Sequence, residues 1–166
     1  MVAGRHIAAA ALATFCLTAA AADYGMIGAA APDFALRAFV GPNIRLSEGR
    51  GDVVVLTFWG SRCAQCRATL SMLNRSYETY RSAGLDMYGI SVDDDAVQAR
   101  DFAMGSRVQF AMLSDPEKAV ARAYQVDNLP MTVLIDRRGG VRYVHRDPGE
   151  GDEALYLSQL RQLLNE

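Results

Sequence analysis

The chain has 166 residues, of which 51% are hydrophobic and 22% are charged, and its formal net charge is −2 at pH 7. This size and composition indicate one globular domain with its own core and exclude an intrinsically disordered chain. A weakly acidic chain without a basic run also lacks the electrostatic footprint of a nucleic-acid-binding protein.

The first 22 residues are predicted to be a secretory signal peptide. Arg5 and His6 precede an apolar run of 16 residues, 7–22, which ends in Ala20-Ala21-Ala22. A short basic start, an apolar stretch and an Ala-x-Ala end are typical of a signal peptide. We therefore expect cleavage after Ala22, a single mature domain over 23–166, and a periplasmic or otherwise exported location. An uncleaved anchor is the alternative, but the run is shorter than the roughly 20 residues that a spanning helix needs.

The next segments are predicted to form a hairpin and then a central strand. Residues 31–39 and 43–47 are extended segments on either side of the turn signal Gly41-Pro42. Residues 53–59, Val-Val-Val-Leu-Thr-Phe-Trp, are β-branched, apolar and aromatic, which favours a strand buried on both faces.

A helix, a strand and a second helix are predicted to follow. The first helix covers 63–83, carries an apolar stripe and ends at Gly84, the usual C-terminal position for glycine. The strand covers 85–92. The second helix covers 93–105, with acidic residues in its first turn. We expect Val97, Phe102 and Met104 to face inward from it.

The last third of the chain is predicted to contain a short extended piece, two helices and a hairpin. The extended piece covers 108–113, and a helix capped near Ser114-Asp115-Pro116 runs to 124. Strands at 131–135 and 141–145 flank a glycine-containing loop. A leucine-rich helix over 153–164, which includes Leu155, closes the chain. Strands that alternate with helices and end in a hairpin indicate an α/β fold with a mixed central sheet and helices on both faces.

The motif that carries chemistry is Trp59-Gly60-Ser61-Arg62-Cys63-Ala64-Gln65-Cys66, where the buried strand becomes a helix. Free N–H groups and the helix dipole favour a negative charge at a helix start, so a thiolate at Cys63 is stabilised, and Arg62 adds positive charge. Cys66 lies one helical turn later and can close a disulfide on Cys63. Cys63 is therefore the expected attacking thiolate and Cys66 the resolving thiol.

Other readings of the cysteine pair are weaker. A structural staple closes a long loop, whereas two intervening residues constrain the unfolded chain little. A zinc site needs two more ligands, and the mature sequence offers only His145, which we expect at the surface. A c-type haem site would need histidine where the chain has Arg67. We therefore predict no metal and no cofactor.

The segment from Phe58 to Cys66 resembles the active site of thioredoxin-like proteins, especially the exported TlpA/ResA-like group with its redoxin or AhpC/TSA-type domain. Ala31-Pro32-Asp33-Phe34 resembles that group's N-terminal motif, Leu129-Pro130-Met131-Thr132 its cis-proline loop, and residues 136–140 its final hairpin. The resemblance implies a thioredoxin fold with an N-terminal β-hairpin extension. It also implies that Pro130 is cis beside the disulfide and that Trp59, Gln65 and Leu129 support the active site.

The sequence departs from the family at the positions that handle protons. Thr57 stands where many thioredoxins have a buried aspartate, and Thr69 where the TlpA/ResA-like group often has a glutamate. Gln65 replaces the usual proline. Asp94 falls where some relatives have a second acid, but three consecutive acids also suit a solvated first helical turn. The group that moves the Cys66 proton stays open between Thr69, Asp94 and water.

These observations predict a thiol–disulfide oxidoreductase that works through a mixed disulfide. The resemblance implies a reductant of exported proteins, for example in cytochrome c maturation or metal-site assembly, recharged by a membrane-bound thiol reductant. The reverse direction, with a membrane-bound oxidant, stays open, and we expect a monomer. Two alternatives are a thiol peroxidase, which would need a proline-containing loop that the chain lacks before Cys63, and a module that binds copper(I) through its thiolates.

Overall fold

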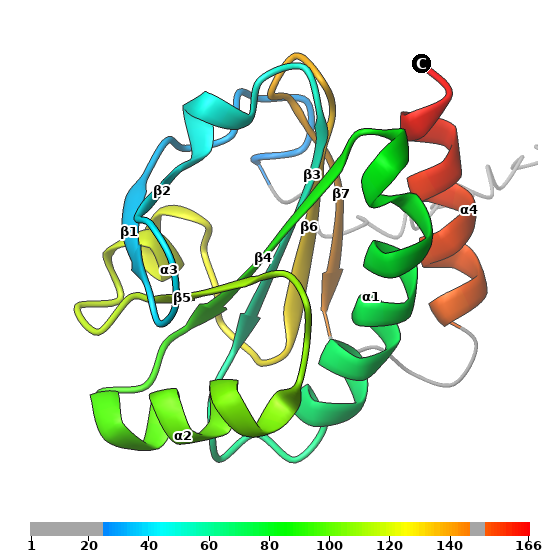
Figure 1. Cartoon of the computed structure of the whole chain (residues 1–166). Helices are drawn as coiled ribbons and strands as arrows, with labels where there is room; N and C mark the ends of the chain where they lie inside the picture. Colours follow the sequence, from blue (N-terminus) through cyan, green and yellow to red (C-terminus); the bar gives the residue numbers. More distant parts are fainter. Residues whose placement is uncertain (1–24, 147–151) are drawn as a thin grey trace, which may run out of the picture.

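The computed structural model describes residues 25–146 and 152–166. Their seven strands form one sheet in the order β2-β1-β5-β4-β3-β6-β7 (Figure 1). The strands are β1 (Ala35–Ala38), β2 (Ile44–Arg45), β3 (Val53–Trp59), β4 (Leu85–Ser91), β5 (Ala111–Ser114), β6 (Met131–Ile135) and β7 (Val141–Arg146). The helices are α1 (Cys66–Tyr80), α2 (Ala96–Ser106), α3 (Ala119–Ala123) and α4 (Asp152–Leu164), with short 3-10 helices η1 (Leu46–Gly49) and η2 (Arg81–Ala83).

The predicted signal peptide, 1–22, and the expected mature start at Asp23 lie outside the described residues. Within the part of the chain that the structure does describe, no helix is long and apolar enough to cross a membrane.

Strand β3 is the centre of the sheet, and all seven of its residues are buried. It pairs parallel with β4, where Trp59 lies opposite Ser91, and antiparallel with β6, where Thr57 lies opposite Thr132. Burying one large apolar side chain contributes roughly 1.5–3 kcal/mol, so this run of apolar residues holds the sheet together. Because β3 and β4 are parallel, the loops after both strands emerge at the same edge of the sheet, and the turn after β3 carries Cys63.

Both faces of the sheet are covered, as predicted. Helices α1, α2 and α4 pack on one face over Val53, Val55 and Trp59. Helix α3 and the N-terminal segment pack on the other face over Leu56 and Phe58. The predicted N-terminal hairpin is confirmed, because β1 pairs antiparallel with β2.

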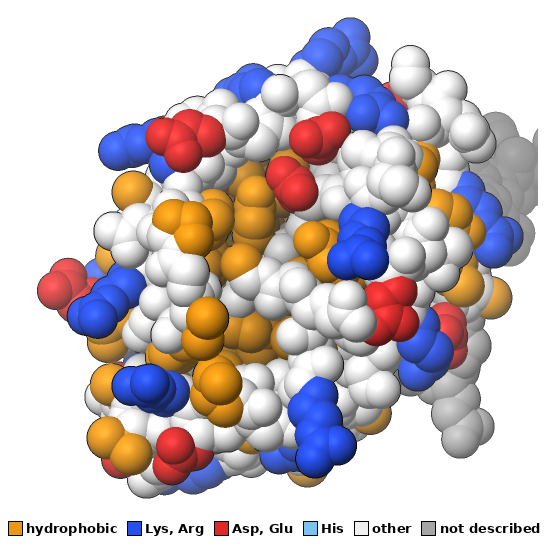
Figure 2. Space-filling view, in the orientation of Figure 1, with side chains coloured by type: hydrophobic (Ala, Val, Ile, Leu, Met, Phe, Trp, Pro, Cys, Tyr) orange, Lys and Arg blue, Asp and Glu red, His pale blue; other side chains and the backbone are white. Residues whose placement is uncertain are grey.

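Figure 2 shows the face that carries α2 at its lower edge, with hydrophobic side chains gathered in a central hollow and charged side chains around the rim. An apolar groove of about 590 Å³ lies between the β1–β2 loop, α1, α2 and β5. Its lining includes Val40, which is 67% exposed, and Met104.

Several predicted boundaries were wrong because local caps decide where helices begin. Helix α1 begins at Cys66 and not at Cys63. Helix α2 begins at Ala96, because the Asp95 carboxylate caps it by accepting the N–H groups of Val97 and Gln98. These two hydrogen bonds lower the pKa of Asp95 from its usual value.

The predicted helix over 114–124 shrinks to α3, and the extended piece becomes β5, which begins at Ala111 and not at 108. The carboxylate of Asp115 accepts the N–H groups of Ala119 at 3.0 Å and Ala121 at 2.8 Å, so the chain before α3 forms a capped turn and no helix.

The inward face of α2 also differs from the prediction. Val97 is 69% exposed and Met104 is 57% exposed, whereas Ala99 and Ala103 are buried against the sheet. Small residues let this helix lie close to β4 and β5, so the large apolar side chains point away. Phe102 is partly buried, as expected, and stacks on Trp59 with ring centroids 4.9 Å apart. In the leucine-rich helix α4, Leu160 and Leu163 are buried, whereas Leu155 is 50% exposed.

Candidate active site

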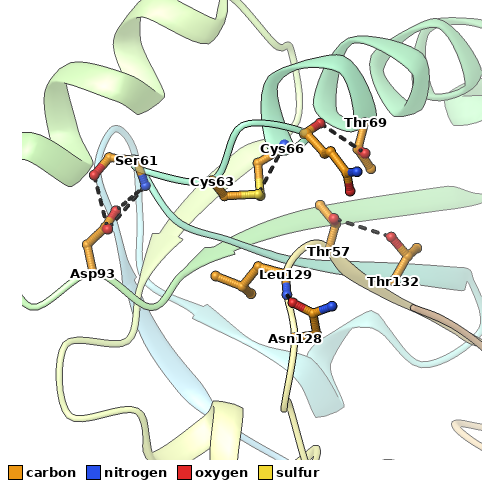
Figure 3. Close-up of a disulfide and its surroundings, with 10 residues drawn as sticks. Thr57, Ser61, Cys63, Cys66, Thr69, Asp93, Asn128, Leu129 and Thr132 are labelled. Carbon is orange, nitrogen blue, oxygen red and sulfur yellow. Dashed lines mark hydrogen bonds between the residues drawn. A yellow bond between two sulfur atoms is a disulfide. The ribbon is translucent and has the colours of Figure 1, made fainter. Parts of the chain in front are cut away.

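The turn between β3 and α1 holds a disulfide between Cys63 and Cys66, whose Cα atoms are 5.4 Å apart (Figure 3). Strand β3 ends at Trp59, and Gly60 begins the turn. The N–H of Cys63 donates to the carbonyl oxygen of Gly60 at 3.1 Å. A side chain at position 60 would bring its Cβ within 3.3 Å of Leu129 Cδ1, so glycine lets the turn approach the neighbouring loop closely.

The sulfur of Cys63 occupies the place of a helix cap. Gln65, the N-cap residue of α1, makes no side-chain cap hydrogen bond. Instead, the N–H of Cys66 donates to Cys63 Sγ at 3.1 Å (Figure 3). The sequence expectation that Cys63 is the first helical residue is therefore wrong by three positions. The sulfur still lies at the positive end of the helix, where the dipole and a free N–H favour a thiolate.

The two cysteines differ in their access to solvent. Cys66 is 0% exposed and belongs to the core cluster beneath α1, whereas Cys63 is partly exposed. Cys63 also lines an open pocket of about 790 Å³, together with Arg62, Gln65, Asp93, Asn128 and Leu129. Of the two sulfur-bearing residues, Cys63 is therefore the one that is open to this pocket.

The loop before β6 forms the opposite wall of this pocket. The peptide bond between Leu129 and Pro130 is cis, as the family resemblance implied. Pro130 is buried, and Leu129 packs against the core cluster that contains Cys66. Asn128 Oδ1 accepts the N–H of Leu129 at 2.9 Å. Of the described residues, Asn128 and Val92 are pocket-lining positions that the sequence reasoning missed.

Asp93 is the most densely bonded acid at the site, and the sequence reasoning did not single it out. Its carboxylate accepts the N–H of Ser61 at 2.8 Å and the Ser61 hydroxyl at 3.1 Å (Figure 3). It also accepts the Ser91 hydroxyl at 3.1 Å. One signal could have pointed to it: Asp93 follows a strand parallel to β3, so both strand ends meet at one edge.

The two charged candidates from the sequence lie at the rim of the pocket. Arg62 is exposed. Asp94 has a side chain that is 79% exposed, and its carboxylate lies 2.8 Å from Lys118 Nζ. This ion pair fits the interpretation of Asp94 as a solvated charge near the helix start.

The two threonines at the family's acid positions are buried. Thr57 is 0% exposed and its hydroxyl oxygen accepts the Thr132 hydroxyl at 3.3 Å. Thr69 is 5% exposed, and its hydroxyl donates to the carbonyl oxygen of Gln65 at 3.3 Å. Neither side chain carries a carboxylate, so the surroundings of Cys66 contain hydroxyls where relatives place acids.

Trp59 and His145 take structural positions. Trp59 is 0% exposed, so it supports the site from the core and does not form its surface. His145 Nε2 lies 2.7 Å from Gln159 Oε1, and its ring packs edge-on against Tyr156, so this histidine is partly buried and not simply at the surface. Across residues 25–146 and 152–166, no group of three or more His, Cys, Asp or Glu side chains could hold a metal ion.

A Cys-x-x-Cys disulfide at the start of a helix, opposite a cis-proline loop and at the end of a buried parallel strand, defines a thiol–disulfide oxidoreductase of the thioredoxin fold. The order of the strands and the helices on both faces complete that fold.

Comparison with known proteins agrees with this class. The family model described as AhpC/TSA family matches residues 27–144. The thiol-disulfide oxidoreductase ResA of Geobacillus kaustophilus is 34% identical over 118 residues, which cover 71% of this chain and 68% of that protein.

Two solved structures are also similar. A putative thiol:disulfide interchange protein DsbE from Chlorobium tepidum has a TM-score of 0.79 and 31% identity over 83% of this chain and 97% of that chain. A putative protein disulfide isomerase from Bacteroides thetaiotaomicron has a TM-score of 0.77 and 28% identity over 84% of this chain and 91% of that chain.

The chain therefore belongs to the AhpC/TSA family, and it is a thiol–disulfide oxidoreductase similar to ResA.

Proposed function

We propose that the protein is exported and reduces disulfides in other exported proteins, with Cys63 as the attacking thiol and Cys66 as the resolving thiol. The observation that carries the assignment is the unequal access of the two sulfurs. Cys63 is partly exposed in the pocket, and Cys66 is fully buried. A partner disulfide approaching through the pocket meets Cys63 first.

The reaction begins with reduced protein. The Cys63 thiolate attacks one sulfur of the partner disulfide, a Cys63–partner bond forms, and the other partner sulfur leaves as a thiolate. Cys66 then loses its proton and attacks Cys63 Sγ. The Cys63–Cys66 bond forms, and the second partner sulfur leaves. The partner has gained two electrons and two protons, and a membrane-bound thiol reductant returns this protein to the dithiol state.

The local structure supports this order of events. The Cys66 N–H that donates to Cys63 Sγ favours negative charge on that sulfur while it waits for a partner. After attack, the sulfur of Cys66 already lies within one helical turn of the mixed disulfide, so resolution needs little backbone movement.

Export is supported by the N-terminal pattern of basic residues, apolar run and Ala20-Ala21-Ala22. We propose cleavage after Ala22, action as a monomer, and partners that are exported proteins with cysteine pairs. Cytochrome c maturation and metal-site assembly are processes that need such a reductant, because both consume reduced cysteines.

The test is to trap partners in cells with Cys66→Ser. This variant keeps the attacking thiol and removes the resolving one, so complexes sensitive to reductant should accumulate in the exported fraction. Mass spectrometry of the trapped chain should show linkage at Cys63 and an N-terminus at Asp23. The matched control is Cys63→Ser, which should trap few or no partners. Equal trapping of partners by both variants would overturn the order of attack. A wild-type protein that is mostly in the disulfide form in cells at steady state would indicate an oxidant.

A further inference from the structure

The carboxylate of Asp93 holds the turn that carries the attacking cysteine. Its two oxygens lie 2.8 and 3.1 Å from the Ser61 nitrogen, and it also accepts the Ser61 hydroxyl at 3.1 Å. The Ser91 hydroxyl donates to the same carboxylate at 3.1 Å and accepts the N–H of Asp93 at 3.2 Å. An ionised carboxylate only accepts hydrogen bonds, and every neighbour here donates to it.

This network ties β4 to the β3–α1 turn. Strand pairing already fixes Trp59 opposite Ser91, and the N–H of Val92 donates to the carbonyl oxygen of Trp59 at 3.0 Å. Asp93 extends the connection by two residues into the turn, as far as Ser61. Further along the turn, the N–H of Cys63 donates to the carbonyl oxygen of Gly60. The position of Cys63 therefore depends on a side chain from the neighbouring strand.

The same carboxylate also places a negative charge at the pocket. Asp93 is partly buried and lines the same pocket as Cys63. A nearby negative charge disfavours a thiolate, so it opposes the effect of the helix start. The other charges at the pocket are already partnered or exposed. Asp94 forms an ion pair with Lys118, and Asp127 forms one with Arg146. Arg62 is exposed, and its positive charge helps to lower the pKa of Asp95.

We infer that Asp93 is a positioning residue of the reaction: it fixes the Gly60–Ser61 turn that presents Cys63, and its charge limits how acidic the Cys63 thiol becomes. This inference rests on the proposed role of Cys63. It predicts two separable effects, because the amide of asparagine keeps an acceptor for the Ser61 N–H but removes the charge, whereas alanine removes both.

The test uses reduced protein and an aromatic disulfide that releases the coloured thionitrobenzoate anion. Attack by Cys63 releases one anion, and resolution by Cys66 releases a second, so one stopped-flow trace separates the two steps. For Asp93→Asn, we expect the pH midpoint of the first step to fall by about 0.5 to 1 with resolution little changed. For Asp93→Ala, we expect resolution to slow by about ten- to a hundredfold because the sulfur is misplaced.

The matched control is Asp101→Asn, which removes one carboxylate from the exposed surface of α2 and should leave both steps unchanged. If Asp93→Ala does not fold, the pH midpoint of the first release step in Asp93→Asn still tests the electrostatic role. A variant Asp93→Asn with an unchanged midpoint would overturn the electrostatic role, and Asp93→Ala with unchanged resolution would overturn the positioning role. If Cys66 and not Cys63 causes the first release of thionitrobenzoate in the wild type, the proposed order of attack is overturned.

Discussion

At the scale of single residues, the chemistry depends on how differently the structure treats two cysteines only three positions apart. Cys63 takes the place of a helix cap and opens on a pocket, whereas Cys66 is enclosed by the core. The groups near Cys66 are hydroxyls, because Thr57 and Thr69 stand where relatives place acids. The Thr69 hydroxyl donates to the backbone carbonyl of Gln65, and a neutral hydroxyl is too weak a base to take the Cys66 proton as a carboxylate would.

We therefore predict that Thr69→Glu changes the pH dependence of the resolving step. Position 69 is buried on the α1 face that also carries Cys66. Burial raises the pKa of an introduced carboxyl above its usual value of about 4.3. Above that pKa the carboxylate can act as a base, and resolution should accelerate by about a hundredfold. The measurement is the second phase of thionitrobenzoate release between about pH 5 and 9.

The control for this prediction is Thr69→Gln, which has nearly the same volume as glutamate but no titratable group. It should reproduce any packing effect of the longer side chain without the change in pH dependence. Superimposable profiles for wild type and Thr69→Glu would show that position 69 is not on the proton path.

At the scale of elements, the turn between β6 and β7 is organised by one carboxylate far from the redox pair in sequence. Asp136 accepts the N–H groups of Arg138 at 3.0 Å and Gly140 at 2.9 Å, and it pairs with Arg142 at 3.4 Å. Gly139 has a φ of +82°, a conformation that glycine adopts without strain, so this turn needs its glycine. Burial alone would raise the pKa of Asp136, but the hydrogen bonds from Gly140, Arg138 and Arg142 outweigh it and lower the pKa.

This depressed pKa predicts how the turn responds to acid. A carboxylate whose folded-state pKa is lowered stabilises the fold above its unfolded-state pKa and loses that contribution as the pH falls through the folded-state value. At pH 7, Asp136→Asn should lower the melting temperature by about 2 to 6 °C. The difference from wild type should shrink below about pH 4, as the wild-type carboxyl is protonated.

Thermal melts from about pH 2 to 7 would check this prediction. The exposed substitution Asp101→Asn serves as the control and should follow the wild type throughout. A gap between wild type and Asp136→Asn that stays constant with pH would mean that the side chain acts through shape and not through charge.

At the scale of the whole molecule, the redox state of the cysteine pair is coupled to the stability of the fold. The disulfide closes a loop of two intervening residues, so it adds little by restricting the unfolded chain. Any difference in stability between the oxidised and reduced protein therefore reports how the folded state favours one redox form. A folded state that favours the disulfide has a lower reduction potential than the unfolded chain, which is the property of a reductant.

We predict that the oxidised protein is more stable than the reduced protein, in line with the proposed direction. Each 1 kcal/mol of difference should raise the melting temperature of a domain of this size by about 2–4 °C. Melting curves with and without an excess of small-molecule reductant would measure it. The double variant Cys63→Ser with Cys66→Ser should melt at the same temperature in both conditions. A higher melting temperature for the reduced wild type would contradict the assignment as a reductant and favour an oxidant.

The sequence by itself determined the order of the strands and helices and the position of the redox pair, because these depend on local pattern. The β-branched run 53–59, the Cys-x-x-Cys spacing and the Gly84 stop act over a few residues, and the structure has β3, the disulfide and the end of η2 at those places. The cis bond before Pro130 was also predicted, but only through the family resemblance, since local pattern rarely distinguishes cis from trans.

Only the tertiary structure decided which side chains meet at the site. The sequence singled out Asp94, yet its neighbour Asp93 reaches Ser61, because the pairing of β3 with β4 sets which residue faces the turn. Val97 and Met104 looked like core residues by type, but the α2 residues that are fully buried against the sheet are Ala99 and Ala103. Contacts between segments some 30 residues apart depend on register and on how closely elements approach, and neither is set by the residues of one segment alone.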